Sequence, residues 1–192
     1  MEDLDLGVCR GRWWVSDPDR VAVVLPGARY DTSAPLLWFA REVALARGWS
    51  VLEVRDEFLD RSADPWRWVE DRAEAALAYA GSVRCLLVTK SLSSHAVRLA
   101  AGLGLPGIWL TPLIAVDDDV AAGFRRLEGP ALLVGGTADP SWAGGLARGF
   151  GHDVLELEGA NHALQLDGDP LGSVDALRRV AERIDAFVAE LT

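Results

Sequence analysis

The chain has 192 residues, of which 50% are hydrophobic and 25% are charged, and its formal net charge at pH 7 is −10. These proportions are those of an ordinary globular protein, and the length fits one domain over residues 1–192 with a sizeable core. The negative charge argues against nucleic-acid binding, which needs clustered Lys and Arg, and no apolar run approaches the roughly 20 residues of a membrane-spanning helix.

Apolar runs bounded by turn residues alternate with helical patterns along the first half of the chain. The segment 7–15 is suited to an antiparallel edge strand, and residues 15–19 are expected to form only a turn. The pattern then predicts a strand over 20–25, a helix over 36–47 ending before Gly48, and a strand over 49–54. Asp64 followed by Pro65 is typical of a helix start, and the helix that begins there should stop at Gly81.

The second half repeats the same alternation. Residues 83–89 form a continuous apolar run, as expected for a central parallel strand that is covered on both faces. The remaining pattern predicts helices over 91–101 and 117–126, strands at 108–110, 131–134 and 154–157, and a last helix that begins at Asp169-Pro170. Strands alternating with helices indicate a three-layer α/β/α sandwich with a mostly parallel sheet.

Ser91 stands where the central strand is expected to turn into a helix. Ligands of parallel α/β sheets bind beyond the carboxyl ends of the strands, and a sharp turn there would lift the hydroxyl of Ser91 clear of the sheet. The N–H of Leu92, at the start of the following helix, would then be free to bind an oxyanion. The usual glycines on either side of such a serine are replaced by Thr89 and Ser93, and helix capping by the serines is the competing interpretation.

Two nucleotide-binding patterns fit less well. Lys90-Ser91 resembles the end of a Walker A motif, but an apolar strand runs directly into it where that motif needs a glycine-rich loop. Gly102, Gly104 and Gly107 match G-x-G-x-x-G but follow a helix and precede a strand, the reverse of the dinucleotide-binding context, so helix termination explains them better. A Ser-Lys pair is also disfavoured, because neighbours around such a turn point in different directions.

Asp139 and His162 each follow their own strand, so they are expected at the same edge of the sheet as Ser91. A histidine there can act as general base toward the serine, and an acid can hold its ring in the right tautomer. The rival acids, Asp117 and its two neighbours, fit a helix N-terminus better. Of the other histidines, His95 is expected to face solvent or a neighbouring helix, and His152 the opposite end of the sheet.

The loop after the first parallel strand, Pro26-Gly27-Ala28-Arg29-Tyr30, should supply a second oxyanion-binding N–H. Ala28 is the preferred donor and Arg29 the next. Tyr30, Arg29 and Trp142 are the candidates for contact with substrate.

Four segments together resemble a small bacterial α/β-hydrolase family without a lid. They are Pro26-Gly27-Ala28-Arg29-Tyr30, Thr89-Lys90-Ser91-Leu92-Ser93, Gly135-Gly136-Thr137-Ala138-Asp139-Pro140 and Gly159-Ala160-Asn161-His162. The resemblance covers the chain from the first parallel strand to the last helix. It implies a serine hydrolase with Ser91 as nucleophile, Asp139 as acid and His162 as base.

The expected activity is therefore hydrolysis of a carboxylic ester or thioester, without a metal or organic cofactor. The alternative is a hydrolase-like scaffold that binds a ligand without turnover. Only the short 117–126 helix stands where larger relatives insert a lid, so an open cleft for a small-molecule ester is expected. The acidic start, Met1 to Asp5, lacks signal-peptide features and suggests a cytoplasmic location, as a monomer or homodimer. Cys9 and Cys85 have no zinc-like spacing, and Cys85 is expected to be a small buried residue.

Overall fold

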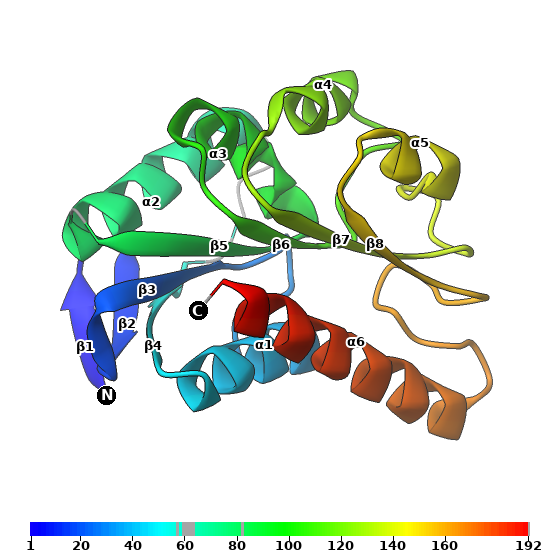
Figure 1. Ribbon diagram of the computed structural model, residues 1–192, viewed down its shortest axis with the longest axis horizontal. Helices are drawn as coiled ribbons and strands as arrows, with labels where there is room; N and C mark the ends of the chain where they lie inside the picture. The colour runs from blue at the N-terminus through cyan, green and yellow to red at the C-terminus, as the bar shows by residue number, and fades with distance from the viewer. Residues whose placement is uncertain (57, 59–63, 82, 192) are drawn as a thin grey trace.

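A twisted eight-stranded sheet organises the molecule (Figure 1). The computed structural model describes residues 1–56, 58, 64–81 and 83–191. The strands follow the order β1-β2-β4-β3-β5-β6-β7-β8, in which the pairs from β4 to β8 are parallel and β1 and β2 add an antiparallel edge. Their bounds are β1 (Glu2–Asp5), β2 (Arg10–Trp14), β3 (Asp17–Leu25), β4 (Trp49–Val54), β5 (Arg84–Lys90), β6 (Gly107–Leu110), β7 (Ala131–Gly136) and β8 (Asp153–Leu157).

Helices cover both faces of the sheet, which confirms the predicted α/β/α sandwich. In Figure 1, α1 and α6 lie on one face and α2, α3, α4 and α5 on the other. Their bounds are α1 (Pro35–Ala46), α2 (Pro65–Ala80), α3 (Val97–Leu103), α4 (Asp118–Arg126), α5 (Gly144–Gly149) and α6 (Pro170–Glu190), and a 3₁₀ helix, η1 (Ser91–Ala96), joins β5 to α3. Each layer of helices closes its own hydrophobic cluster against the sheet.

Side-chain caps fix where several helices begin. The carboxylates of Asp64, Asp117 and Asp169 accept hydrogen bonds from backbone N–H groups in the first turns of α2, α4 and α6. Such bonds satisfy donors that the helix itself leaves unpaired. At the other end of α3, Gly104 has the left-handed conformation that commonly ends a helix. Gly104 therefore terminates the helix, as the sequence predicted, whereas Gly102 lies inside α3 and Gly107 begins β6.

The N-terminal region departs from the sequence prediction in two places. The structure adds β1, an edge strand paired with β2, whose exposed polar sequence gives little strand signal. Residues 15–19 were predicted to be only a turn, but β3 already begins at Asp17, which pairs with Trp49 before an irregularity in the register. The predicted edge strand itself is confirmed as β2, which runs antiparallel to β4.

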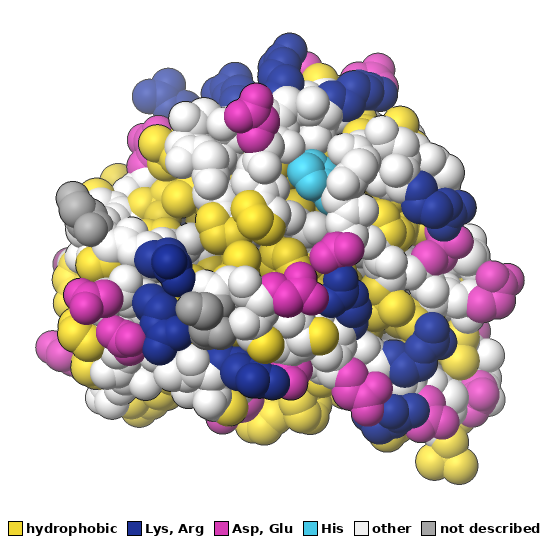
Figure 2. All heavy atoms as spheres, in the orientation of Figure 1, with side chains coloured by type: hydrophobic (Ala, Val, Ile, Leu, Met, Phe, Trp, Pro, Cys, Tyr) yellow, Lys and Arg dark blue, Asp and Glu magenta, His cyan; other side chains and the backbone are white. Residues whose placement is uncertain are grey.

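One face of the molecule carries acidic and basic side chains in mixture. On the face drawn in Figure 2, Lys and Arg side chains lie among Asp and Glu, with apolar groups between them. Both cysteines are free thiols in the interior, as expected for Cys85, and burial raises their pKa values, that of Cys9 to about 11. None of the helices in the described part of the chain has the length and apolar character needed to span a membrane.

Candidate active site

Ser91 occupies a sharp turn at the carboxyl end of the central strand. It is the first residue after β5, and its backbone has a φ of +50°. This left-handed conformation is costly for a residue with a side chain and persists only where the surroundings enforce it. Here β5 leads into the turn and η1 leads out of it, so the strain serves to project the Ser91 side chain from the edge of the sheet. This is the geometry of a nucleophile elbow.

Asp139 and His162 reach Ser91 from two other strand ends. His162 lies in the loop after β8, and its Nε2 is 2.8 Å from Ser91 Oγ. Its Nδ1 is 2.8 Å from Oδ2 of Asp139, which lies in the loop after β7. The structure thus brings together the three residues that the sequence singled out, in the order acid, imidazole, hydroxyl. Both contacts are within hydrogen-bond reach, as general-base chemistry requires.

Asp139 is held as a carboxylate in a buried position. Only 3% of the residue is exposed, and this burial by itself raises the pKa of the carboxyl group. Hydrogen bonds from the His162 ring and from the backbone N–H of Ser141 outweigh that effect, and the pKa lies below its ordinary value. An ionised Asp139 accepts a hydrogen bond from Nδ1–H of His162, which holds the ring in the tautomer whose Nε2 is free to act as a base toward Ser91.

The turn accommodates Thr89 and Ser93 in different ways. Thr89 is 1% exposed, and its hydroxyl makes a long 3.5 Å contact with the carbonyl oxygen of Ile108 on the neighbouring strand β6. The Ser93 hydroxyl donates a hydrogen bond to the carbonyl oxygen of Pro26, in the loop after β3. Ser93 therefore links the serine turn directly to the loop that faces it.

That loop presents its backbone toward the serine. Gly27 and Tyr30 exchange backbone hydrogen bonds, and Arg29 has a φ of +55°, so the chain between them forms a tight turn. Among the described residues, no acceptor is bonded to the N–H of Ala28. Leu92 is the second residue of η1, where a helix leaves its N–H groups unpaired. Ala28 lines the cavity at Ser91 and Leu92 directly follows Ser91, and the binding of an oxyanion by their N–H groups stays a prediction.

A cavity of about 440 Å³ joins these groups. It is lined by Ala28, Arg29, Tyr30, Lys90, Ser91, Ala138, Pro140, Asn161, His162 and Ala163. It therefore includes two of the predicted substrate contacts, Arg29 and Tyr30.

The third, Trp142, does not line this cavity. Its indole N–H donates a 2.8 Å hydrogen bond to Glu156, its ring occupies the space above Gly135, and only 7% of the residue is exposed. The sequence placed it near Asp139 but could not show that it turns into the core.

Lys90, which the sequence analysis considered only as part of a Walker A motif or a Ser-Lys pair, lines the cavity at Ser91. Its side chain is buried, with Nζ 2.5 Å from Thr111 Oγ1 and 3.0 Å from the backbone carbonyl oxygen of His162. The ammonium group also lies 5.1 Å from the centre of the Tyr30 ring. Burial lowers the pKa of Lys90 to about 8, although the nearby Asp139 carboxylate opposes the shift. The side chain thus ties the β5 end to the backbone that carries the imidazole.

The other two histidines lie away from Ser91. His95 is buried on η1, where its ring stacks on Trp66 of α2 and its Nε2 is 3.0 Å from Asp117. It therefore faces a neighbouring helix and not solvent. His152 precedes β8, and its Nε2 lies 3.2 Å from the carbonyl oxygen of Phe124. Within the described residues, no three His, Cys, Asp or Glu side chains are grouped as metal ligands.

Comparisons of sequence find no relative, whereas comparisons of structure find many. No protein-family model matches the chain, and no curated protein matches its sequence significantly. Among solved structures, Est1E from Butyrivibrio proteoclasticus is 12% identical with a TM-score of 0.75, over 98% of this chain and 97% of its own. XC6422 from Xanthomonas campestris, described as an α/β serine hydrolase without a lid, is 15% identical with a TM-score of 0.73, over 99% and 93%.

A third similar structure is the monoacylglycerol lipase of Paleococcus ferrophilus, 13% identical with a TM-score of 0.71, over 97% of this chain and all of its own. At these identities the likeness concerns the arrangement of strands and helices. It extends over nearly the whole length of each chain. The chain therefore adopts the α/β-hydrolase fold.

Proposed function

We propose that this protein is a serine hydrolase that cleaves a carboxylic ester or thioester through an acyl-enzyme on Ser91. The observation that carries the proposal is the continuous hydrogen-bonded chain from Asp139 through His162 to Ser91, with 2.8 Å at each contact. The strained backbone of Ser91 adds weight, because such strain concentrates at functional sites. A scaffold that only binds a ligand would need neither feature.

In the proposed reaction, His162 Nε2 accepts the proton of Ser91 Oγ as this oxygen attacks the carbonyl carbon. The N–H groups of Ala28 and Leu92 donate hydrogen bonds to the oxyanion that forms. His162 then gives the proton to the leaving alcohol or thiol, and the acyl group remains on Ser91. A water molecule deprotonated by His162 then attacks the acyl carbon, the bond to Ser91 Oγ breaks, and His162 returns the proton to this oxygen as the carboxylic acid product leaves. Asp139 orients the ring and stabilises the imidazolium throughout.

The substrate is proposed to be a small-molecule ester in an open cleft, and the proposed location is cytoplasmic. The described chain between β6 and β7 contains one helix, α4, which contacts α3. Larger hydrolases of this fold place a lid in the corresponding stretch. With α4 held against α3, substrate would enter the cavity at Ser91 without a lid movement.

A fluorophosphonate probe tests the proposal, because it reacts covalently with an activated serine. The wild-type protein should be labelled, and Ser91→Ala should not. Ser94→Ala is the matched control, since Ser94 lies one helical turn further on η1 and its hydroxyl accepts a hydrogen bond from Leu113 instead. Labelling that persists in Ser91→Ala would refute the assignment of the nucleophile.

A further inference from the structure

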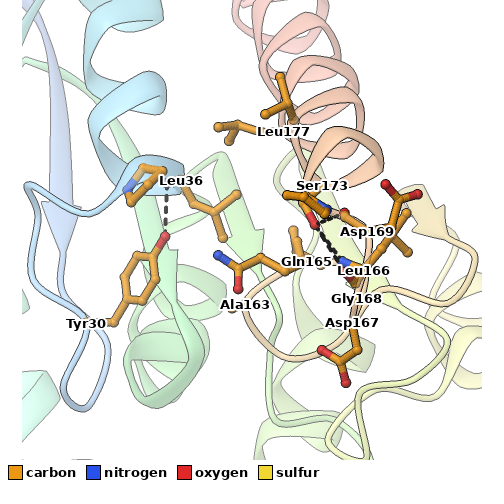
Figure 3. A pocket seen from close by; sticks show the side chains of 14 residues that line it. Tyr30, Leu36, Ala163, Gln165, Leu166, Asp167, Gly168, Asp169, Ser173 and Leu177 are labelled. Atoms are coloured by element: carbon orange, nitrogen blue, oxygen red, sulfur yellow. Dashed lines mark hydrogen bonds between the residues drawn. The ribbon is translucent and has the colours of Figure 1, made fainter.

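A second cavity, of about 480 Å³, lies between the loop after β3 and the loop that follows His162 (Figure 3). Its walls are largely apolar: Leu36 comes from α1, Leu166 from the His162 loop, and Val174 and Leu177 from α6. The volume is in the range of small-molecule sites, which are typically apolar with a few polar groups. None of the residues assigned above to the catalytic steps lines this cavity.

The cavity adjoins the one that contains Ser91. Tyr30 and Ala163 line both of them, and Ala163 directly follows His162. Tyr30 stands at the junction, with its hydroxyl oxygen accepting a 3.0 Å hydrogen bond from the backbone N–H of Leu36. A molecule whose carbonyl group lies at Ser91 could therefore extend past Tyr30 into the apolar space.

The charges around this second cavity favour an uncharged occupant. Of the described residues that line it, none is Lys or Arg, while Asp167 and Asp169 contribute carboxylates. Asp169 caps α6 and Asp167 accepts a hydrogen bond from Asn161, so each carboxylate has a neutral partner. The other polar side chains that line the cavity are neutral: the hydroxyls of Tyr30 and Ser173, and the carboxamide of Gln165, which points toward Tyr30 and Leu36 in Figure 3. An anionic group would meet carboxylates there with no cation to offset the repulsion.

Hydrogen bonds within the protein organise the walls of this cavity. Asn161 Oδ1 accepts hydrogen bonds from the backbone N–H groups of Ala163 and Gln165, and Leu164 adopts a φ of +58° that turns the chain. The Ser173 hydroxyl on α6 is bonded to the backbone of Leu166. A preformed cavity loses little conformational entropy when it is filled, so apolar contact there can contribute to binding.

We propose that this second cavity binds the uncharged, apolar portion of the substrate and so selects esters with a medium-length hydrocarbon group. The inference rests on the proposed function, because it assumes that an ester reacts at Ser91. It adds the part of the substrate that sequence motifs leave undefined: a neutral hydrocarbon extending from the carbonyl carbon or from the leaving oxygen. Each added methylene that enters an apolar pocket should increase kcat/KM.

The test uses p-nitrophenyl esters from acetate to decanoate with the wild type, Val174→Trp and Leu171→Trp. Val174 is 62% exposed, so a larger side chain is tolerated by the fold while it narrows the cavity. Leu171 is 79% exposed on the same helix and does not line the cavity, which makes it the matched control. For the wild type, kcat/KM should increase from acetate to hexanoate. In Val174→Trp the ratio of octanoate to acetate kcat/KM should fall about tenfold or more.

A second series keeps the acetyl group and lengthens the alcohol, from ethyl to octyl acetate. If Val174→Trp lowers the ratio of long-chain to short-chain kcat/KM in the first series, the acyl chain lies in the cavity. If it lowers that ratio in the second series, the alcohol lies there. If the ratios are unchanged in both series, or if wild-type activity decreases steadily with chain length, the cavity proposal is wrong. Failure of the proposed function is distinguishable, because Ser91→Ala would then match the wild type on every ester.

Discussion

Ser93 shows how this chain manages without the glycines of a usual serine turn. Its hydroxyl donates to the Pro26 carbonyl oxygen, and Ser93 itself is almost fully buried. Pro26 is two residues before Ala28, whose N–H is proposed to bind the oxyanion. The bond therefore restrains the loop that carries Ala28 relative to the turn that carries Leu92. A glycine at position 93 would relieve crowding but leave the loop without this link.

Replacing Ser93 with Ala should lower kcat about tenfold with little change in KM, because the oxyanion forms only along the reaction path. Removal of the buried hydrogen bond should also cost about 1–2 kcal/mol of unfolding free energy. Ester kinetics and urea denaturation measure the two effects. Ser94→Ala is the control: it loses a buried hydroxyl that bonds to Leu113, so it should lose stability and keep kcat. Equal losses of kcat in both variants would contradict the positioning role of Ser93.

Lys90 is a second residue whose role depends on burial. Its ammonium group is bonded to Thr111 and to the His162 carbonyl oxygen, away from solvent. Burial lowers its pKa from an ordinary 10.5 to about 8. Between these two pH values the unfolded chain binds more protons than the folded one. The stability of the wild type should therefore rise with pH across this window and carry the full cost of the buried charge below it.

The Lys90→Met variant isolates this effect, since it lacks the titrating group. The difference in unfolding free energy, wild type minus variant, should increase by about 3 kcal/mol between about pH 7.5 and pH 10.5. Urea denaturation of both proteins at several pH values measures it. Unfolding free energies that stay parallel over the whole range would show that Lys90 keeps its ordinary pKa.

At the scale of elements, the strands and helices that build the site were predictable because local signals agreed. The apolar run before Lys90 could only be a covered strand, and the aspartates at 64, 117 and 169 indicated where helices begin. Short elements at the edges of the fold were harder to predict. Glu2–Asp5 pairs through its backbone and exposes all its side chains except Leu4, which packs against the core, and Gly144–Gly149 forms a short helix from a sequence with little helical preference.

In the candidate site, too, some features could be predicted from the sequence and others could not. Ser91, Asp139 and His162 could be placed together because residues just beyond parallel strands share one edge of the sheet. The directions in which individual side chains point could not be predicted from the sequence, because they depend on packing. Trp142 turns toward Glu156 because the side-chain-free Gly135 leaves room for its ring, and Lys90 turns beneath Tyr30 and Thr111. Nothing in the local sequence of either residue encodes that choice.

For the whole molecule, the net charge of −10 and the charges near the site act in opposite directions. Arg29 is an exposed cation in the cavity at Ser91, whereas Lys90 in the same cavity is buried. At low salt the many acidic side chains together repel an approaching anion. One exposed arginine attracts it over a short range only. Because the Debye length is about 10 Å at 0.1 M salt, added salt screens the distant charges more than a close contact.

An anionic ester should therefore react faster as salt is added. For a p-nitrophenyl ester that carries a free carboxylate, kcat/KM should increase several-fold between about 10 mM and 500 mM NaCl. The methyl ester of the same compound, which is neutral, should change little and controls for effects of salt on the enzyme itself. A kcat/KM for the anion that falls with salt would instead mean that Arg29 governs its approach. In that case Arg29→Ala should remove the salt dependence, whereas under the expected result Arg29→Ala should leave the increase in place.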